Sequence, residues 1–257
     1  MTASDSTSRF SDRVADYVRY RPGYPDSLVQ TLVSEAGLGP ASVVADIGSG
    51  TGISSDLFLR LGCQVYGVEP NREMRAAAEA RFRDEPRFRS VAATAEATTL
   101  DSKSIDLVTA GQAFHWFDVE RTRAEFARIL SPQGWIALFW NKRRTESTAF
   151  LRAYEKLLLE FSTDYEQVNH ARVDAALLAS FFGGAHFMTR TFPYSQSFDF
   201  EGLRGRLLSS SYAPAAGHPQ HIPMLRELER LFQTHAIEGR VHFDYDTELY
   251  TGSLVQT

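Results

Sequence analysis

The sequence has a single cysteine, no long apolar run and no excess of positive charge. Cys63 alone cannot form an internal disulfide or a cysteine-rich zinc site, which favours a reducing compartment. No run approaches the roughly 20 apolar residues of a membrane-spanning helix, and the polar start, Met1–Arg9, does not resemble a signal peptide. The net charge of −5 argues against a nucleic-acid binder, which needs a basic surface. We therefore expect a cytoplasmic protein with neither membrane nor nucleic acid as a partner.

The amino-acid composition is typical of a globular protein. Of the 257 residues, 43 % are hydrophobic and 23 % are charged. A chain of this length can bury roughly 70–75 % of its unfolded surface, so its core needs no disulfide or structural metal. Because no repeat, linker or change in composition divides the chain, we expect one domain over residues 1–257, without a metal site.

Short apolar runs alternate with helix-like segments in the first half of the chain. Strand, helix, strand with short connections indicates right-handed βαβ units and a mostly parallel sheet. The runs are nearly all apolar, as is typical of strands covered on both faces. The expected strands are 43–47, 64–68, 88–92, 105–110 and 134–140, and the expected helices are 52–61, 72–82 after Asn71, and the segment from Asp118 to Pro132. The second half is less regular, with helices expected at 150–161, 175–182, 203–208 and 222–232 and strands at 187–192 and 241–245.

The most informative stretch is Ala45–Gly52, which reads ADIGSGTG between the first expected strand and the following helix. Its three glycines let the backbone bend sharply and approach a ligand closely, and a helix N-terminus adds oriented N–H groups. The G-x-G-x-G spacing differs from the dinucleotide fingerprint G-x-G-x-x-G, and the Lys-Ser/Thr of a phosphate-binding loop is missing.

An acidic residue at the end of the second expected strand adds to this signal. Glu69 follows Asp46 by 23 residues, and an acid at such a place can accept hydrogen bonds from both hydroxyls of a ribose. Together with the glycine turn it predicts an adenosine-containing ligand at the carboxyl ends of the strands. The alternative is that Glu69 merely faces solvent.

These segments resemble class I S-adenosylmethionine-dependent methyltransferases, of the small-molecule group that includes the ubiquinone/menaquinone and trans-aconitate enzymes. The resemblance covers residues 10–140 well and the rest only loosely. The matching segments are Val43–Gly52, Val68–Asn71, Ala95–Ala97, Ile105–Asp118 and Arg128–Phe139, together with Tyr17–Pro25, which is similar to part of that group.

The resemblance implies a doubly wound, Rossmann-like α/β fold. Its seven-stranded, mostly parallel sheet would have an antiparallel last strand, helices on both faces and a helical lid. The core would span about residues 35–145 plus C-terminal strands, and the lid would come from 10–30 and 145–235.

The resemblance also implies S-adenosylmethionine (SAM) as the cofactor, S-adenosylhomocysteine (SAH) as the product, and a role for individual residues. Asp46 would lie near the amino group of the cofactor's methionine part, and Glu69 would hold the ribose. The other expected cofactor-binding residues are Gly48, Ser49, Gly50, Pro70, Asn71, Met74, Ala95, Glu96 and Gln112.

Several residues are candidates for the acceptor side of such a site. His115 is the candidate general base, although it could instead pack between its aromatic neighbours. Tyr20 and Arg21 could bind a carboxylate of the cofactor or the substrate, or lie in a solvated loop. Trp116, Trp140 and Tyr212 could form the walls of the substrate pocket, and the arginines 143, 144, 204 and 206 are expected to be solvated.

We therefore expect methyl transfer to a small-molecule acceptor by in-line displacement. The protein would align the acceptor with the methyl group and exclude water. An acceptor that is already ionised needs no base, whereas a phenol or carbon acid benefits from one. Two alternatives stay open. One is a SAM-binding protein without methyl transfer, such as a scaffold, a cyclase or a protein with a structural cofactor. The other is an NAD-dependent oxidoreductase. The sequence does not specify the acceptor, the methylated atom or the oligomeric state.

Overall fold

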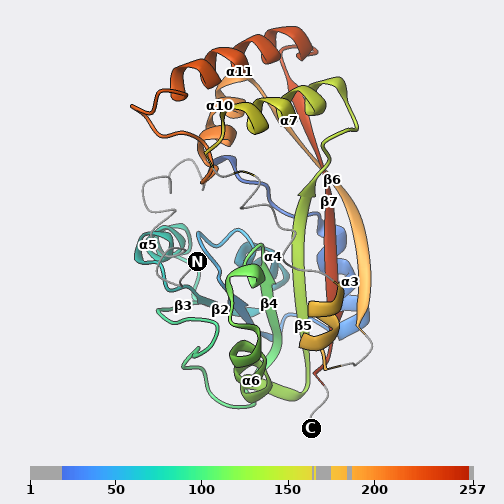
Figure 1. Ribbon diagram of the computed structural model, residues 1–257. Coiled ribbons are helices and arrows are strands. Elements are labelled where there is room, and N and C mark those ends of the chain that lie inside the picture. Colours follow the sequence, from blue (N-terminus) through green and yellow to red (C-terminus); the bar gives the residue numbers. More distant parts are fainter. Residues whose placement is uncertain (1–18, 164, 166–174, 184–186, 255–257) are drawn as a thin grey trace.

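A seven-stranded sheet forms the body of the computed structural model, which describes residues 19–163, 165, 175–183 and 187–254. The strand order is β3-β2-β1-β4-β5-β7-β6 (Figure 1). Neighbouring strands from β3 to β5 are parallel, and β7 is antiparallel to both β5 and β6. The predicted sheet with its antiparallel last strand is confirmed. The bounds are β1 (Val43–Ile47), β2 (Gln64–Val68), β3 (Phe88–Val91), β4 (Ile105–Gly111), β5 (Leu130–Arg143), β6 (Met188–Phe198) and β7 (Val241–Gly252).

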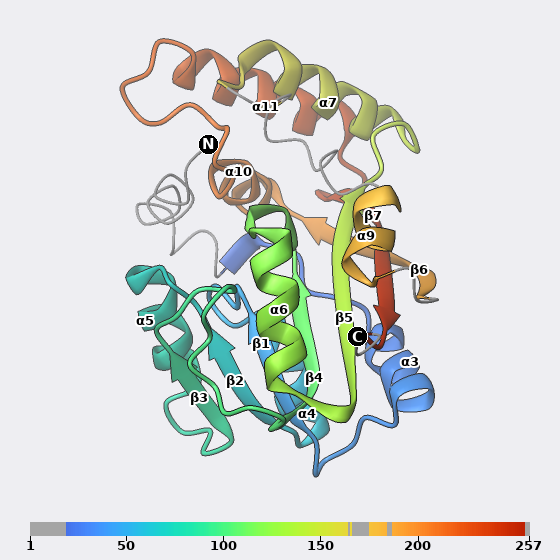
Figure 2. The ribbon, with the colours of Figure 1, turned by 60° about the horizontal axis from the view of Figure 1, so that its bottom comes forward.

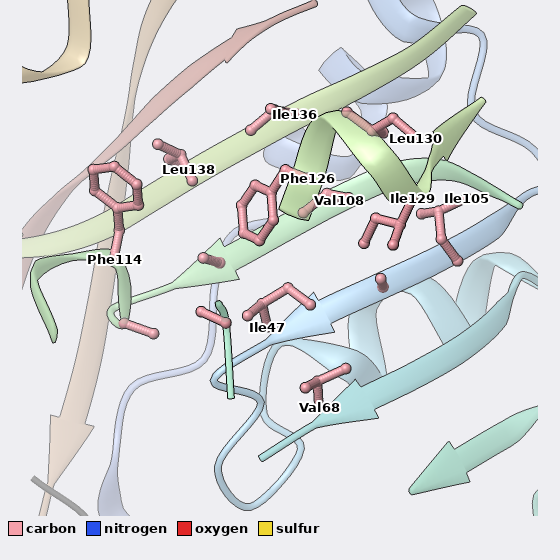
Figure 3. Close-up of a cluster of buried hydrophobic side chains, with 14 of the residues drawn as sticks. Ile47, Val68, Ile105, Val108, Phe114, Phe126, Ile129, Leu130, Ile136 and Leu138 are labelled. Carbon is pink, nitrogen blue, oxygen red and sulfur yellow. The ribbon is translucent and has the colours of Figure 1, made fainter. Parts of the chain in front are cut away.

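Helices cover both faces of the sheet because the strands are apolar on both sides. One face is covered by α3 (Asp26–Ala36) and α4 (Ser55–Leu61). Their side chains Leu28, Leu32 and Phe58 pack against the strands. On the other face lie α6 (Val119–Ile129) and α9 (Ala175–Phe181), in front of the sheet in Figure 2. Figure 3 shows that Phe126 of α6 lies over the strands that carry Val108 and Ile136. α5 (Arg72–Arg81) connects β2 to β3 and begins at the predicted N-cap Asn71.

The strand order reverses between β1 and β4. From β1 the chain continues outward through β2 and β3, and it then returns to place β4 on the other side of β1. In an open α/β sheet, this reversal leaves a crevice beyond the carboxyl ends of the two strands, where ligands bind. The glycine turn follows β1 directly and therefore opens at this crevice.

Three more helices form a layer beyond the carboxyl ends of the strands (Figures 1 and 2). We call this layer the helical cap: α7 (Ala149–Phe161), α10 (Phe200–Leu208) and α11 (His221–His235). Its buried residues Leu158, Leu207 and Leu228 share one cluster with Phe243 of β7. The expected lid range 145–235 also contains β6 and α9. These belong to the sheet and its covering layer, because their apolar residues pack there.

Two local expectations need correction, and one helix was not expected. The helix α6 ends at Ile129 and β5 begins at once, so Pro132 lies inside a strand rather than ending a helix. Pro132 is tolerated because the pairing of β5 with β4 shifts register in that region. The first predicted helix begins at Ser55 instead of residue 52, because the glycine turn occupies the positions before it. The sequence analysis missed α3. Over the part of the chain that is described, no helix is long and apolar enough to cross a membrane.

Candidate functional site

The glycine turn holds its backbone in a conformation that side chains resist. Gly48, Gly50 and Gly52 have φ angles of 67°, 56° and 82°, a region open chiefly to glycine. A Cβ on Gly48 would lie 2.6 Å from the Cβ of Ala113, whereas a Cβ on Gly50 would meet no heavy atom within 4 Å. Gly48 is thus required by packing, and Gly50 leaves an open space above the turn.

Glu69 is buried behind this turn and is 8 % exposed. Its Oε2 accepts a hydrogen bond of 2.9 Å from the Gly50 N–H, and its Oε1 accepts one of 2.8 Å from the Asn71 N–H. Burial is the main cause that raises the pKa of Glu69. The alternative that Glu69 merely faces solvent is wrong. Because two carboxylate oxygens offer about four lone-pair sites, Glu69 can brace the turn and still accept from a ligand.

Asp46 supplies a second buried carboxylate, with no exposed surface. Its Oδ2 accepts hydrogen bonds from the hydroxyls of Ser54, at 2.7 Å, and Ser55, at 2.6 Å. Its Oδ1 has no hydrogen-bond partner among the described residues. A buried acceptor without a donor is costly. A donor brought by a ligand, such as an ammonium group, would satisfy this oxygen, which lies behind the turn and not on the cavity lining.

A cavity of about 610 Å³ extends from the glycine turn to the helical cap. It is lined from below by the ends of β1 and β4 and from above by α10 and the segment that follows it. Of the residues proposed from the sequence, the cavity brings together Arg21, Gly48, Ser49, Gly50, Gln112, His115, Trp116, Trp140 and Tyr212.

Solved structures with a similar fold include methyltransferases. A proposed type II methyltransferase from Anaeromyxobacter dehalogenans aligns with a TM-score of 0.66 and 21 % identity, covering 93 % of this chain and all of that one. A geranyl diphosphate methyltransferase in complex with SAM aligns with a TM-score of 0.51 and 14 % identity, covering 90 % and 85 % of the two chains. At such low identities the likeness concerns the fold.

Sequence comparison finds methyltransferases among the relatives of this chain. The chain is 37 % identical over 145 residues to an uncharacterised methyltransferase of Mycobacterium tuberculosis. That alignment covers 56 % of this chain and 57 % of the relative, so the chain matches little more than half the length of that curated protein. Residues 45–138 match the family model described as a methyltransferase domain. Over these residues the chain is therefore similar to a methyltransferase domain.

A residue with a strained backbone lies where β4 ends. Gln112 has a φ of 58° although it is not glycine, and such conformations persist mainly where the surrounding structure enforces them, often at functional sites. Its Nε2 donates a hydrogen bond of 3.4 Å to the carbonyl of Asn141. Its Oε1 is buried with no partner in the described part of the chain. The backbone therefore presents this amide at the cavity.

The other residues predicted for the site do not line the cavity. Asn71 caps α5 by accepting a hydrogen bond from the Met74 N–H, and the Glu96 carboxylate accepts one from the Asp118 N–H at 3.0 Å. Tyr20 lies against α10, where a Cβ on Gly205 would overlap its ring, and it is not on the cavity lining with Arg21. The predicted site residues that are not on the cavity lining are Tyr20, Asp46, Glu69, Pro70, Asn71, Met74, Ala95 and Glu96.

Two arginines that the sequence analysis assigned to solvent are buried at the cavity. Arg206 is 6 % exposed, and the Arg143 side chain is 11 % exposed, whereas Arg144 and Arg204 are exposed as predicted. Burial follows from the helical cap folding over the cavity, which the sequence analysis did not place. The spacing of Leu203, Arg206 and Leu207 could have given a signal, because positions i, i+3 and i+4 share one helix face.

The buried carboxylate of Asp46 predicts a pH dependence of stability. Burial raises its pKa from the ordinary value of 3.8 to about 6. The folded protein therefore holds this proton more tightly than the unfolded chain does. The resulting stabilisation is present below about pH 4 and is lost as the pH rises through about 6. Because D46N does not titrate, we expect wild-type stability to fall by about 2–3 kcal/mol relative to D46N between about pH 4 and 7. Urea unfolding of both proteins measures this difference, and a difference that stays constant with pH contradicts the shift.

Proposed function

We propose that the chain binds SAM beyond the carboxyl ends of β1, β2 and β4 and transfers its methyl group to a small molecule. The observation that carries the proposal is the glycine turn, with open space at Gly50 and two buried carboxylates, Asp46 and Glu69, behind it. The family of the domain and the SAM held by a structural neighbour support the choice of cofactor.

Each part of SAM has a matching group in the chain. Glu69 would accept hydrogen bonds from the ribose hydroxyls, and the free Oδ1 of Asp46 would accept one from the methionine ammonium. The turn Gly48–Gly50 would lie beneath the cofactor, and Arg21 would bind its carboxylate. Bound SAM supplies a methyl group on a positively charged sulfur. The adenine would lie near Pro70, Asn71, Met74, Ala95 and Glu96.

The chain's own contribution to the reaction is alignment and exclusion of water. Methyl transfer from a sulfonium has a good leaving group, so holding the acceptor in line supplies much of the acceleration. The cavity lies beneath the helical cap, with Trp116 and Trp140 on its wall. His115 lies on the same lining, in the short 3-10 helix Phe114–Trp116 that follows β4. We propose it as the base for acceptors that carry a proton.

Removal of the Glu69 carboxylate tests the ribose contact. We expect E69A to weaken SAH binding by about 1–3 kcal/mol, or roughly 5- to 150-fold, because the variant loses the proposed ribose contacts and the brace on the Gly50 N–H. E69Q keeps one acceptor oxygen and should lose less. E120A, which removes an exposed carboxylate on α6, is the control. Calorimetry that finds E69A and E120A equal to the wild type would remove Glu69 from the site.

Transfer itself is tested by incubating the protein with methyl-labelled SAM and fractionated pools of small molecules. We expect label to appear in a small molecule and SAH to accumulate in step with it. SAH binding without any label transfer in any pool would support a cofactor-binding protein that does not methylate. Binding of NAD in place of SAH would support an oxidoreductase.

A further inference from the structure

The cavity contains a buried guanidinium that the cofactor contacts above do not use. Arg206 on α10 lines the cavity and is 6 % exposed. Its Nη1 donates a hydrogen bond of 3.1 Å to the hydroxyl of Ser210, while its Nε is buried and has no partner within the described chain. No carboxylate among the described residues forms an ion pair with it, although its neighbour Arg204 pairs with Glu201. Arginine does not give up its proton in proteins, so Arg206 is a buried charge.

Both carboxylates on the described lining already pair with other cations. Lys142 lies 3.7 Å from Glu248, and Arg143 donates to the carboxylate of Glu155. These two ion pairs balance both of the lining's carboxylates. Arg21 and Arg206 are the further cations on this lining. Arg21 donates a hydrogen bond of 3.0 Å to the carbonyl of Ser209 and is assigned above to the cofactor carboxylate, which leaves Arg206 for another anion.

We infer that the methyl acceptor is an acidic small molecule whose oxyanion binds Arg206, an inference that rests on the proposed function. A buried charge without a counterion is costly, and an oxyanion delivered by the ligand removes that cost. The planar guanidinium suits two parallel hydrogen bonds to a carboxylate or a phosphate. The Tyr165 and Tyr212 rings pack 4.9 Å apart between their centroids at the same cavity, whose wall also holds Trp116 and Trp140. This aromatic lining fits an acid with a flat, apolar body.

Three small aromatic probes test whether the cavity prefers an anion. Benzoate and phenyl phosphate are anionic, and benzamide is the neutral counterpart of benzoate. Their binding can be followed by tryptophan fluorescence with SAH saturating, because Trp116 and Trp140 line the cavity. We expect at least one of the two anions to bind the wild type at least tenfold more tightly than benzamide. Tighter benzoate binding identifies the oxyanion as a carboxylate, and tighter phenyl phosphate binding identifies it as a phosphate ester.

The variant R206Q should bind the preferred anion at least about tenfold more weakly, with its benzamide affinity unchanged. R206K, which keeps the charge but not the planar fork, should fall between R206Q and the wild type. R204Q removes an arginine two positions away that is 46 % exposed and off the cavity, and it should behave like the wild type. Equal anion affinity in R206Q and the wild type overturns the inference, as does anion binding no tighter than that of benzamide.

SAH titrations of the same proteins separate this inference from the proposed function. We expect R206Q to bind SAH as the wild type does, since Arg206 is not assigned to the cofactor. Intact SAH binding with no preference for the anions removes only the acidic acceptor. Absence of SAH binding by the wild type removes the proposed function itself.

Discussion

G50A is expected to bind SAH at least about a hundredfold more weakly than the wild type while losing only about 1 kcal/mol of stability. The stability cost comes from placing a side chain at a φ of 56°, in the left-handed region. The loss of binding has a different cause. The added Cβ would meet no protein atom within 4 Å, so it would occupy the space in which the backbone must approach the cofactor.

G37A is the matched control for this variant. Gly37 also has a left-handed φ, 65°, and a Cβ there would also meet nothing within 4 Å. However, Gly37 caps the C-terminus of α3 and is not on the cavity. Both variants should unfold at similar urea concentrations, and only G50A should lose SAH. If the two variants bind SAH equally well, the turn does not hold the cofactor.

H115A is expected to lower kcat by about a hundredfold or more with an acceptor that must lose a proton, because a positioned general base contributes about 10²–10⁴. The acceptor would be one found by the labelled-SAM screen. SAH affinity should stay at the wild-type value, since His115 is not assigned to the cofactor.

Added imidazole distinguishes a base from a packing residue. The His115 ring lies on the cavity lining, with its centroid 4.8 Å from that of Trp116, so H115A should leave space at the site for a free imidazole. Imidazole should then restore part of the lost activity. H242A, which alters an exposed histidine on β7, should show neither the loss nor the rescue. Unchanged kcat of H115A with such an acceptor would show that His115 is not the base and only packs against Trp116.

The sequence predicted the parts of the fold in which local pattern and burial agree. Four of the five residues of Val43–Ile47 are apolar and all but Val43 are buried, and Asn71 caps the helix that it was expected to cap. The helix α3 was not predicted. It begins directly after Pro25, its N-cap, and its residues Leu28 and Leu32 show helix spacing.

The site was predictable where one short segment forms it and unpredictable where distant segments meet. The glycine turn is local, so Gly48 and Gly50 could be identified from spacing alone. Arg206 becomes part of the cavity only because α10 lies above strands that precede it by more than 60 residues. A lone arginine in a sequence is expected at the surface, and tertiary packing reversed that expectation.

A crystal structure of the protein with SAH tests the central claim most directly. We expect the ligand along the turn Gly48–Gly50, with its ribose hydroxyls donating to Glu69 and its ammonium group donating to Oδ1 of Asp46. SAH bound elsewhere, or a turn that stays empty at saturating SAH, would contradict the account.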